Sequence, residues 1–137
     1  MRFVDTNVLL YSVSTAEEDE PKARVARAIL DEADVALSTQ VLQEFYVQAT
    51  HSRRPDRLTH EQAATLIDSF LRFPVQATTT KLVLAALETR ERYQMSYWDA
   101  AIIEAARAAG CPQVLSEDLA HGQDYGGVRV ENPFREL

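Results

Sequence analysis

The sequence predicts an α/β protein: a three-layer α/β/α sandwich around a central parallel sheet of about five strands. Short apolar runs alternate along the chain with longer segments that repeat their apolar residues at helical spacing. Strands that alternate with helices favour a parallel sheet joined by right-handed crossovers, with helices on both faces. No repeat or Gly/Ser-rich linker divides the 137 residues, so we expect one domain over residues 1–137.

The first half of the chain is expected to supply two strands and three helices. Pro21 opens an amphipathic helix because its fixed φ and missing N–H suit the first helical turn. The expected elements are a strand over 2–4, a helix after Asp5, a helix over 21–33, a strand over 35–37, and a helix over 39–50 followed by a polar turn over 51–58.

The second half is marked by clear helix-start and helix-stop residues. Thr59 with Gln62 forms a capping box, and Ser96 with Asp99 begins another helix that Gly110 and Pro112 end. The expected elements are a helix after Thr59, a strand over 74–77, a helix from Thr79 or Thr80 to Tyr93, a helix from Ser96, and strands over 113–115 and 128–130.

Composition narrows the class of protein. No apolar run is long enough to cross a bilayer and no signal peptide is present at the N-terminus, so we expect a cytoplasmic location. Cys111 is the only cysteine, which excludes an internal disulfide and a thiolate zinc site, and we expect it to be a buried apolar residue. The net charge of −7 argues against binding nucleic acid through a whole-molecule basic field.

Two carboxylates stand at predicted strand ends. Asp5 closes the first strand and Asp118 follows the fourth, so both emerge at the carboxyl edge of the sheet, where ligands bind in such folds. Taken singly, each would more often be a helix N-cap than a ligand.

Two more carboxylates are predicted to reach the same edge from helices. Asp99 shares a helix face with Ile102, Ile103 and Ala106, which places it at the head of a buried stripe, although a capping role beside Ser96 explains its spacing too. Glu44 lies beside the apolar face of the helix that follows the second strand, where a solvated glutamate is the alternative.

Four carboxylates in one place need a counter-charge, because like charges a few ångströms apart repel strongly in a low-dielectric pocket. Oxygen-only ligands suit Mg²⁺ or Mn²⁺ better than zinc. Such a site can activate a water and offset charge on a leaving oxygen, so the chemistry indicated is phosphodiester hydrolysis.

The motifs that hold these acids resemble those of the PIN-domain ribonucleases, and most closely the VapC-type toxins of bacterial toxin-antitoxin modules. The segments "FVDTNVLLY", "STQVLQEFY", "SYWDAAIIEAA" and "VLSEDLAHG" are similar to the family's four acidic motifs, in its order and near its spacing. The resemblance covers residues 1 to 134 and implies the PIN-like fold.

By this resemblance, the catalytic and metal-binding acids are Asp5, Glu44, Asp99 and Asp118, with Asp5 and Asp99 the most direct ligands. Glu117 competes with Asp118 as the fourth acid, and the family pattern of hydroxyl residue, any residue, Asp selects Asp118. The resemblance also makes Thr6, Asn7 and Ser116 supporting polar groups.

The resemblance implies a Mg²⁺- or Mn²⁺-dependent endoribonuclease that acts as a homodimer and is neutralised by a cognate VapB-like antitoxin. RNA is then the substrate, with tRNA the favoured class. Two alternatives stay open: a catalytically silent PIN-fold interaction protein, and a haloacid-dehalogenase-like phosphatase using Asp5 as nucleophile. The phosphatase would want a second Asp where Asn7 stands.

Several other residues are candidates for RNA or partner contacts, each with a plain alternative. The basic candidates, otherwise solvated surface charges, are Arg53, Arg54, Arg57, Lys81, Arg90 and Arg92. His121 is a weaker candidate for substrate contact. Tyr97 and Trp98 are interpreted as core or dimer-interface residues rather than as platforms for base stacking.

Overall fold

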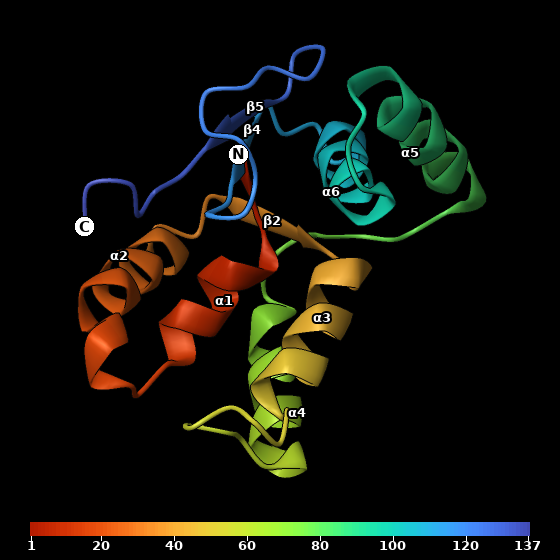
Figure 1. Cartoon of the computed structure of the whole chain (residues 1–137). Coiled ribbons are helices and arrows are strands. Elements are labelled where there is room, and N and C mark those ends of the chain that lie inside the picture. The colour runs from red at the N-terminus through yellow and green to blue at the C-terminus, as the bar shows by residue number, and fades with distance from the viewer.

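The computed structural model describes residues 1–137, and it confirms the predicted α/β fold (Figure 1). The strands are β1 (Arg2–Val4), β2 (Val35–Ser38), β3 (Val75–Gln76), β4 (Gln113–Leu115) and β5 (Arg129–Glu131). The helices are α1 (Thr6–Val13), α2 (Glu20–Asp31), α3 (Thr39–Ala49), α4 (His60–Phe70), α5 (Thr80–Tyr93) and α6 (Tyr97–Ala108), with a short 3₁₀ helix, η1 (Glu17–Asp19), before α2. No helix is long and apolar enough to cross a membrane.

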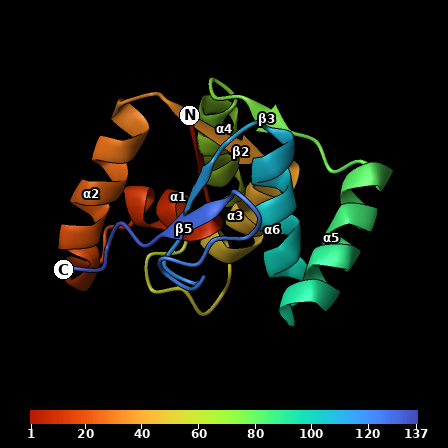
Figure 2. The same ribbon diagram turned by 90° about the horizontal axis from the view of Figure 1, so that it is seen from above.

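All five strands are parallel and lie in the order β3-β2-β1-β4-β5. Helices α1 to α4 cover one face of the sheet, and α5 and α6 cover the other (Figures 1 and 2). From β1 the chain crosses to β2 on one side, whereas β4 pairs with β1 on the other. Such a reversal opens a crevice at the carboxyl ends of the central strands, where ligands bind in this class of fold.

Capping residues set the helix boundaries much as the sequence predicts. The Thr59 hydroxyl accepts a hydrogen bond from the Gln62 N–H, and the Gln62 side chain accepts one from the Thr59 N–H, which completes the predicted capping box. Thr79 rather than Thr80 caps α5. Gly110 follows α6 with φ of +76°, a left-handed conformation that glycine adopts without steric cost.

The main difference from the sequence prediction lies between α1 and α2. The acidic run there forms η1, which the apolar periodicity did not indicate because none of its residues is buried. Helix α2 begins at Glu20 and ends at Asp31, two residues before the predicted end, because Ala33 has φ of +61° and cannot continue a right-handed helix. Strand β3 is two residues long rather than four.

The core contains one buried carboxylate outside the crevice. Glu104 of α6 is 7% exposed and accepts hydrogen bonds from the Thr89 hydroxyl at 2.8 Å and from Arg107 Nε at 3.0 Å. The Arg107 guanidinium also donates to the carbonyl oxygens of Tyr125 and Gly126. This network ties α5, α6 and the loop before β5 together. Cys111 is buried, as predicted.

We expect Arg107→Met to lower the free energy of unfolding by about 2–3 kcal/mol, because it leaves the buried Glu104 carboxylate without its charge partner. The measurement is urea denaturation followed by circular dichroism. Arg24→Met is the matched control, since the Arg24 side chain is 77% exposed and pairs only with Glu20 on the surface of α2. Its expected effect is under about 1 kcal/mol. Equal losses in the two variants would contradict the role given to Arg107.

Candidate active site

The crevice at the carboxyl edge of the sheet holds all four acids that the sequence singled out. Asp5 follows β1, Asp118 follows β4, Glu44 lies on α3 and Asp99 lies in the first turn of α6. Together they line a pocket of about 80 Å³. Its remaining lining residues are Thr6, Asn7, Gln40, Gln48, Trp98 and Ile102. Residues more than a hundred positions apart in the sequence are thus brought to one point.

Asp5 is the most buried of the four acids, with 8% of its surface exposed. Its Oδ1 accepts the Thr6 N–H at 2.8 Å, which is the predicted capping role, and its Oδ2 accepts the Ser116 hydroxyl at 2.7 Å. Burial raises the pKa of Asp5 to about 6; these two hydrogen bonds oppose the rise, and the nearby charges of Glu44 and Asp118 add to it. The carboxylate is therefore held in place at an energetic cost.

Asn7 connects the chain after β1 to the chain after β4. Its side-chain Nδ2 donates to Ser116 Oγ and to Asp118 Oδ2, each at 3.2 Å. Its Oδ1 accepts the Glu117 N–H at 3.2 Å, and the Asp118 N–H donates to Ser116 Oγ. Asn7 and Ser116 are both buried, so this network fixes the position of Asp118 relative to Asp5.

Glu44 is positioned by Gln40, one helical turn earlier on α3. Gln40 Nε2 donates to Glu44 Oε1 at 3.0 Å and to the Trp98 carbonyl at 3.2 Å, which links α3 to the start of α6. Burial raises the pKa of Glu44, the Gln40 hydrogen bond lowers it, and the charges of Asp99 and Asp118 raise it further. The repulsion felt by Asp5 and Glu44 shows that the four carboxylates share one electrostatic environment.

Asp99 combines both interpretations that its spacing allowed. Its N–H donates to the Ser96 hydroxyl at 3.1 Å, so Ser96 caps α6 as predicted. Its carboxylate accepts no hydrogen bond from the protein and lines the pocket. The capping interaction involves only the Asp99 backbone, which leaves the side chain free for a ligand.

The structure separates Glu117 from Asp118. The Glu117 carboxylate forms an ion pair with Lys22 of α2, whose ammonium also donates to the Tyr11 hydroxyl. Asp118 points the other way and lines the pocket with the three other acids. Glu117 therefore anchors the loop from outside, and Asp118 is the acid that faces the site.

The donor set fits a hard divalent cation. The pocket offers carboxylate, amide and hydroxyl oxygens and no sulfur or imidazole ligand. The Thr6 hydroxyl, which lines the pocket, is the one buried side-chain polar atom without a hydrogen-bond partner, so a ligand or ordered water there would satisfy it. No three of the acids stand close enough to enclose an ion by themselves.

Three of the other sequence interpretations can be compared with the structure. Trp98 is 65% exposed at the edge of the pocket, so it is not a core residue, and the alternative of a dimer-interface residue stays a prediction; Tyr97 does pack partly against the core. His121 accepts the Asn132 N–H at 3.0 Å and does not line the pocket. Arg54 is paired with Asp56 at 2.9 Å, and both side chains are largely buried, which makes it a structural residue of the polar turn.

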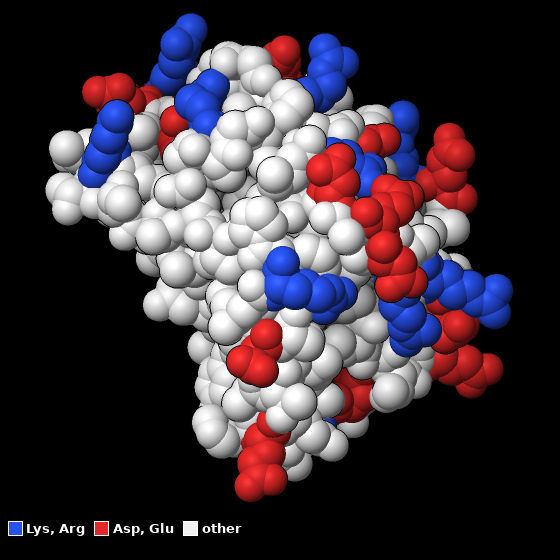
Figure 3. Space-filling model, turned by 180° about the vertical axis from the view of Figure 1, so that it is seen from behind, with Lys and Arg blue, Asp and Glu red and all other residues white.

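The surface has no continuous basic patch on the face seen from behind, where Lys and Arg are interspersed with Asp and Glu (Figure 3). Arg53, Arg57, Lys81, Arg90 and Arg92 are all exposed. Two pocket residues, Gln40 and Gln48, were not predicted. The spacing of Gln40 four residues before Glu44 is the only sequence signal that pointed to a pair on one helix face.

Comparison with known proteins identifies related folds. Residues 2–122 match the family model described as PIN domain. No curated protein matches the sequence. Among solved structures, the Mycobacterium tuberculosis VapC20 toxin, described as cleaving the Sarcin-Ricin loop, has a TM-score of 0.67 and 19% identity, over 86% of this chain and 92% of that chain.

Two toxin-antitoxin structures are similar over nearly the whole chain. A toxin-antitoxin complex from Klebsiella pneumoniae has a TM-score of 0.70 and 18% identity, over 97% of this chain and 98% of that chain. The DNA-bound VapBC of Salmonella typhimurium has a TM-score of 0.66 and 19% identity, over 96% of this chain and 97% of that chain. At these identities the likeness establishes a common fold.

Proposed function

Because this chain belongs to the PIN domain family, we propose that it is a metal-dependent endoribonuclease, the toxin of a type II toxin-antitoxin module. In this proposal residues 1–137 form a single PIN domain that acts in the cytoplasm as a homodimer. Asp5, Glu44, Asp99 and Asp118 are its catalytic and metal-binding residues. The family membership removes the support for a phosphatase of the haloacid dehalogenase type.

The observation that carries the proposal is the meeting of four carboxylates from four separate elements in one pocket. Helix capping explains Asp5 and Asp99 only in part, and it explains neither Glu44 nor Asp118. A fold gains nothing in stability from placing four acids together, since burial raises the pKa of Asp5 and of Glu44 and the charges of the neighbouring acids raise both further. Such clusters are typical of functional sites.

A Mg²⁺ or Mn²⁺ ion bound by Asp5 and Asp99 would lower the pKa of a water and offset charge on the leaving oxygen of a phosphodiester. The chain's own residues prepare this site. Ser116 and Asn7 fix the carboxylates of Asp5 and Asp118, and Gln40 fixes that of Glu44.

The proposed partners are an RNA substrate and a VapB-like antitoxin. Solved structures of similar fold include a toxin that cleaves the Sarcin-Ricin loop and toxin-antitoxin complexes, two of them with DNA from their promoter or with bound DNA. The net charge of −7 suits a basic antitoxin segment, which could neutralise the acidic pocket by occupying it. Among RNA classes, tRNA is favoured by the resemblance of the four motifs.

The test is incubation of the purified chain with total cellular RNA, followed by sequencing of the new RNA ends. We expect cleavage at discrete sites in Mg²⁺ or Mn²⁺ and none in EDTA. The proposal also predicts that the adjoining open reading frame encodes a small antitoxin, and adding that protein is expected to abolish cleavage. A chain that binds that partner but cuts no RNA with either metal would instead be the catalytically silent interaction protein.

A pair of variants tests which acid of the loop after β4 serves the site. We expect Asp118→Asn to lower the cleavage rate by about 10- to 100-fold, because Asp118 faces the pocket. Glu117→Gln removes the Lys22 ion pair, which is partly exposed, and is expected to change the rate by no more than about twofold. Initial rates on one labelled RNA are compared at fixed metal concentration. The reverse order of effects would assign the role to Glu117.

A further inference from the structure

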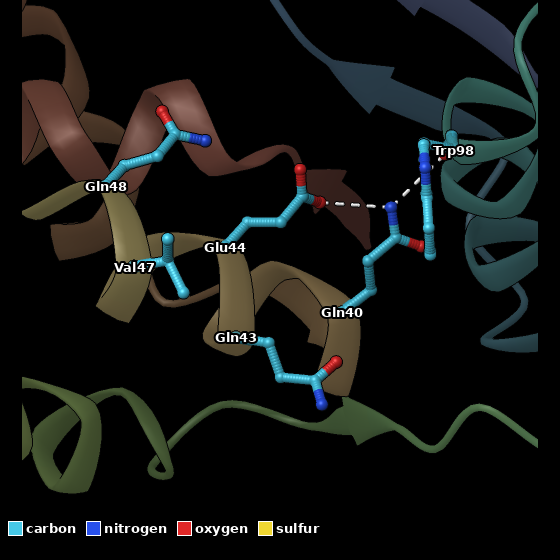
Figure 4. Close-up of a pocket in the computed structure, with 6 residues that line it drawn as sticks. All are labelled: Gln40, Gln43, Glu44, Val47, Gln48 and Trp98. Atoms are coloured by element: carbon cyan, nitrogen blue, oxygen red, sulfur yellow. Dashed lines mark hydrogen bonds between the residues drawn. The ribbon is translucent and has the colours of Figure 1, made fainter. Parts of the chain in front are cut away.

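A second, larger cavity of about 320 Å³ opens directly beside the acid pocket. Figure 4 shows that residues of α3 form one side of it and that Trp98, from the start of α6, forms the other. Its lining residues are Gln40, Gln43, Glu44, Val47, Gln48 and Trp98, which we call the α3 groove. Gln40, Glu44, Gln48 and Trp98 line the acid pocket as well. A ligand held in the acid pocket therefore extends naturally into the α3 groove.

Trp98 is the most exposed large apolar side chain of the molecule, at 65%. Its position is nevertheless defined: the Trp98 carbonyl accepts the Gln40 amide at 3.2 Å, and the Tyr97 ring packs edge-on against the indole at 5.1 Å between centroids. The indole is thus a flat apolar surface held on a rigid helix start beside the candidate metal site. Nothing in the chain itself stacks on it.

The polar groups of the α3 groove suit a neutral, flat ligand. The Gln43 and Gln48 side chains are exposed and make no hydrogen bond within the protein, so each offers a free donor and a free acceptor. No Lys or Arg lines the groove, and its one charged residue, Glu44, is already part of the acid pocket. A phosphate would be repelled there, whereas the edge of a nucleobase can pair with amide groups.

We propose that the α3 groove is a nucleobase subsite, in which a base next to the scissile phosphate stacks on Trp98 and hydrogen-bonds to Gln43 or Gln48. The inference rests on the proposed RNA cleavage and deepens it by assigning base recognition to particular residues. Stacking of unpaired bases on aromatic side chains is a general mode of single-stranded RNA recognition. A second copy of this chain is the other occupant that the exposed Val47 and Trp98 side chains would suit, and the fluorescence test below distinguishes it from a base.

The chain offers a direct readout, since Trp98 is its only tryptophan. In Mg²⁺, and after correction for light absorbed by the base with free tryptophan as the reference, we expect ribonucleoside 5′-monophosphates at millimolar concentrations to quench Trp98 fluorescence and ribose 5-phosphate, which lacks the base, to leave it unchanged. This measurement does not depend on cleavage, so it stays informative if the nuclease assay fails. Equal responses to the two ligands, or none to either, would overturn the subsite. So would a blue shift that grows with protein concentration alone, since it would show that a second copy covers the indole.

Cleavage kinetics provide a second test of the nucleobase subsite. On an oligoribonucleotide that spans a mapped cleavage site, we expect Trp98→Ala to lower kcat/KM by about tenfold or more and Trp98→Tyr to retain most of it. An oligoribonucleotide that lacks the base at one position beside the cleaved bond is expected to lower kcat/KM of the wild type by a similar factor. The same substrate is expected to leave kcat/KM of Trp98→Ala unchanged. Leu84→Ala, which truncates a 58% exposed side chain on α5, is the matched control and should match the wild type. If the losses in kcat/KM from Trp98→Ala and from the missing base were additive, Trp98 would not contact that base.

Discussion

Asp99→Asn is expected to fold as the parent does and to cleave RNA at least about 100-fold more slowly at saturating Mg²⁺, because the proposed function makes Asp99 one of the two most direct metal ligands. The substitution is mild for the fold. The Asp99 N–H keeps its hydrogen bond to Ser96, and the lost carboxylate accepts no hydrogen bond from the protein. Losing a charge favourable to the helix dipole costs about 0.5 kcal/mol, and relief of repulsion with Glu44 offsets it.

The measurement is the initial rate of cleavage, with the midpoint of thermal unfolding recorded for the same protein. Asp68→Asn is the matched control, because Asp68 is an exposed acid on α4 that does not line the pocket. We expect it to cleave RNA as the wild type does. If Asp99→Asn were equally active, the pocket would not be the catalytic site.

Asp5→Asn is expected to abolish cleavage and, in metal-free buffer at neutral pH, to raise the free energy of unfolding by about 1–2 kcal/mol. The pKa of Asp5 rises from 3.8 to about 6 on folding, so its ionisation opposes folding by about 3 kcal/mol at neutral pH. In Asp5→Asn, the new side-chain oxygen can still accept the hydrogen bond from the Thr6 N–H, but the amide nitrogen cannot accept the one from the Ser116 hydroxyl. The loss of that second hydrogen bond offsets part of the gain in stability.

The pH dependence of the free energy of unfolding shows whether burial of the Asp5 charge causes the stability difference. A group whose pKa is raised on folding supports stability at low pH, and that support is lost as pH rises through the folded pKa. The stability advantage of Asp5→Asn over the wild type should therefore be smallest below pH 3.8, grow between there and about 6, and level off above. Urea titrations of both proteins in EDTA across this range measure it. A constant difference at every pH would show that burial of the Asp5 charge is not its source.

Added metal should make the wild type the more stable of the two proteins. An ion that binds only the folded state stabilises it, so Mn²⁺ is expected to raise the unfolding midpoint of the wild type and to leave that of Asp5→Asn nearly unchanged. Zero response of the wild type at millimolar Mn²⁺ would contradict a metal site at Asp5.

Most of the fold could be predicted because its signals are local. The capping box at Thr59, the stop at Gly110 and the alternation of strands with helices are all legible within a few residues. Helix η1 could not be predicted in this way, because none of its residues is buried. The early end of α2 could not be predicted either, because alanine rarely adopts the left-handed backbone conformation that Ala33 has.

The site was predictable where its chemistry is carried by charge. A carboxylate beside apolar residues stands out in a sequence, and the four acids that line the pocket were singled out in that way. Gln40 was missed and the exposure of Trp98 was left open, because both depend on which elements meet in space. A glutamine on a helix is unremarkable until its amide is seen to join Glu44 to the start of α6. An aromatic residue in a helix start is usually buried, and only the position of α6 at the crevice edge exposes Trp98.

The hydrogen bonds that Asn7 and Asp5 form with Ser116 join the first residues made by the ribosome to some of the last. Strand β1 likewise lacks its β4 neighbour until residue 115 has left the exit tunnel. A nascent chain without residues 115 and 116 lacks these contacts of Asp5 and of strand β1. If the chain is the nuclease proposed above, cleavage activity is therefore expected only once synthesis is nearly complete.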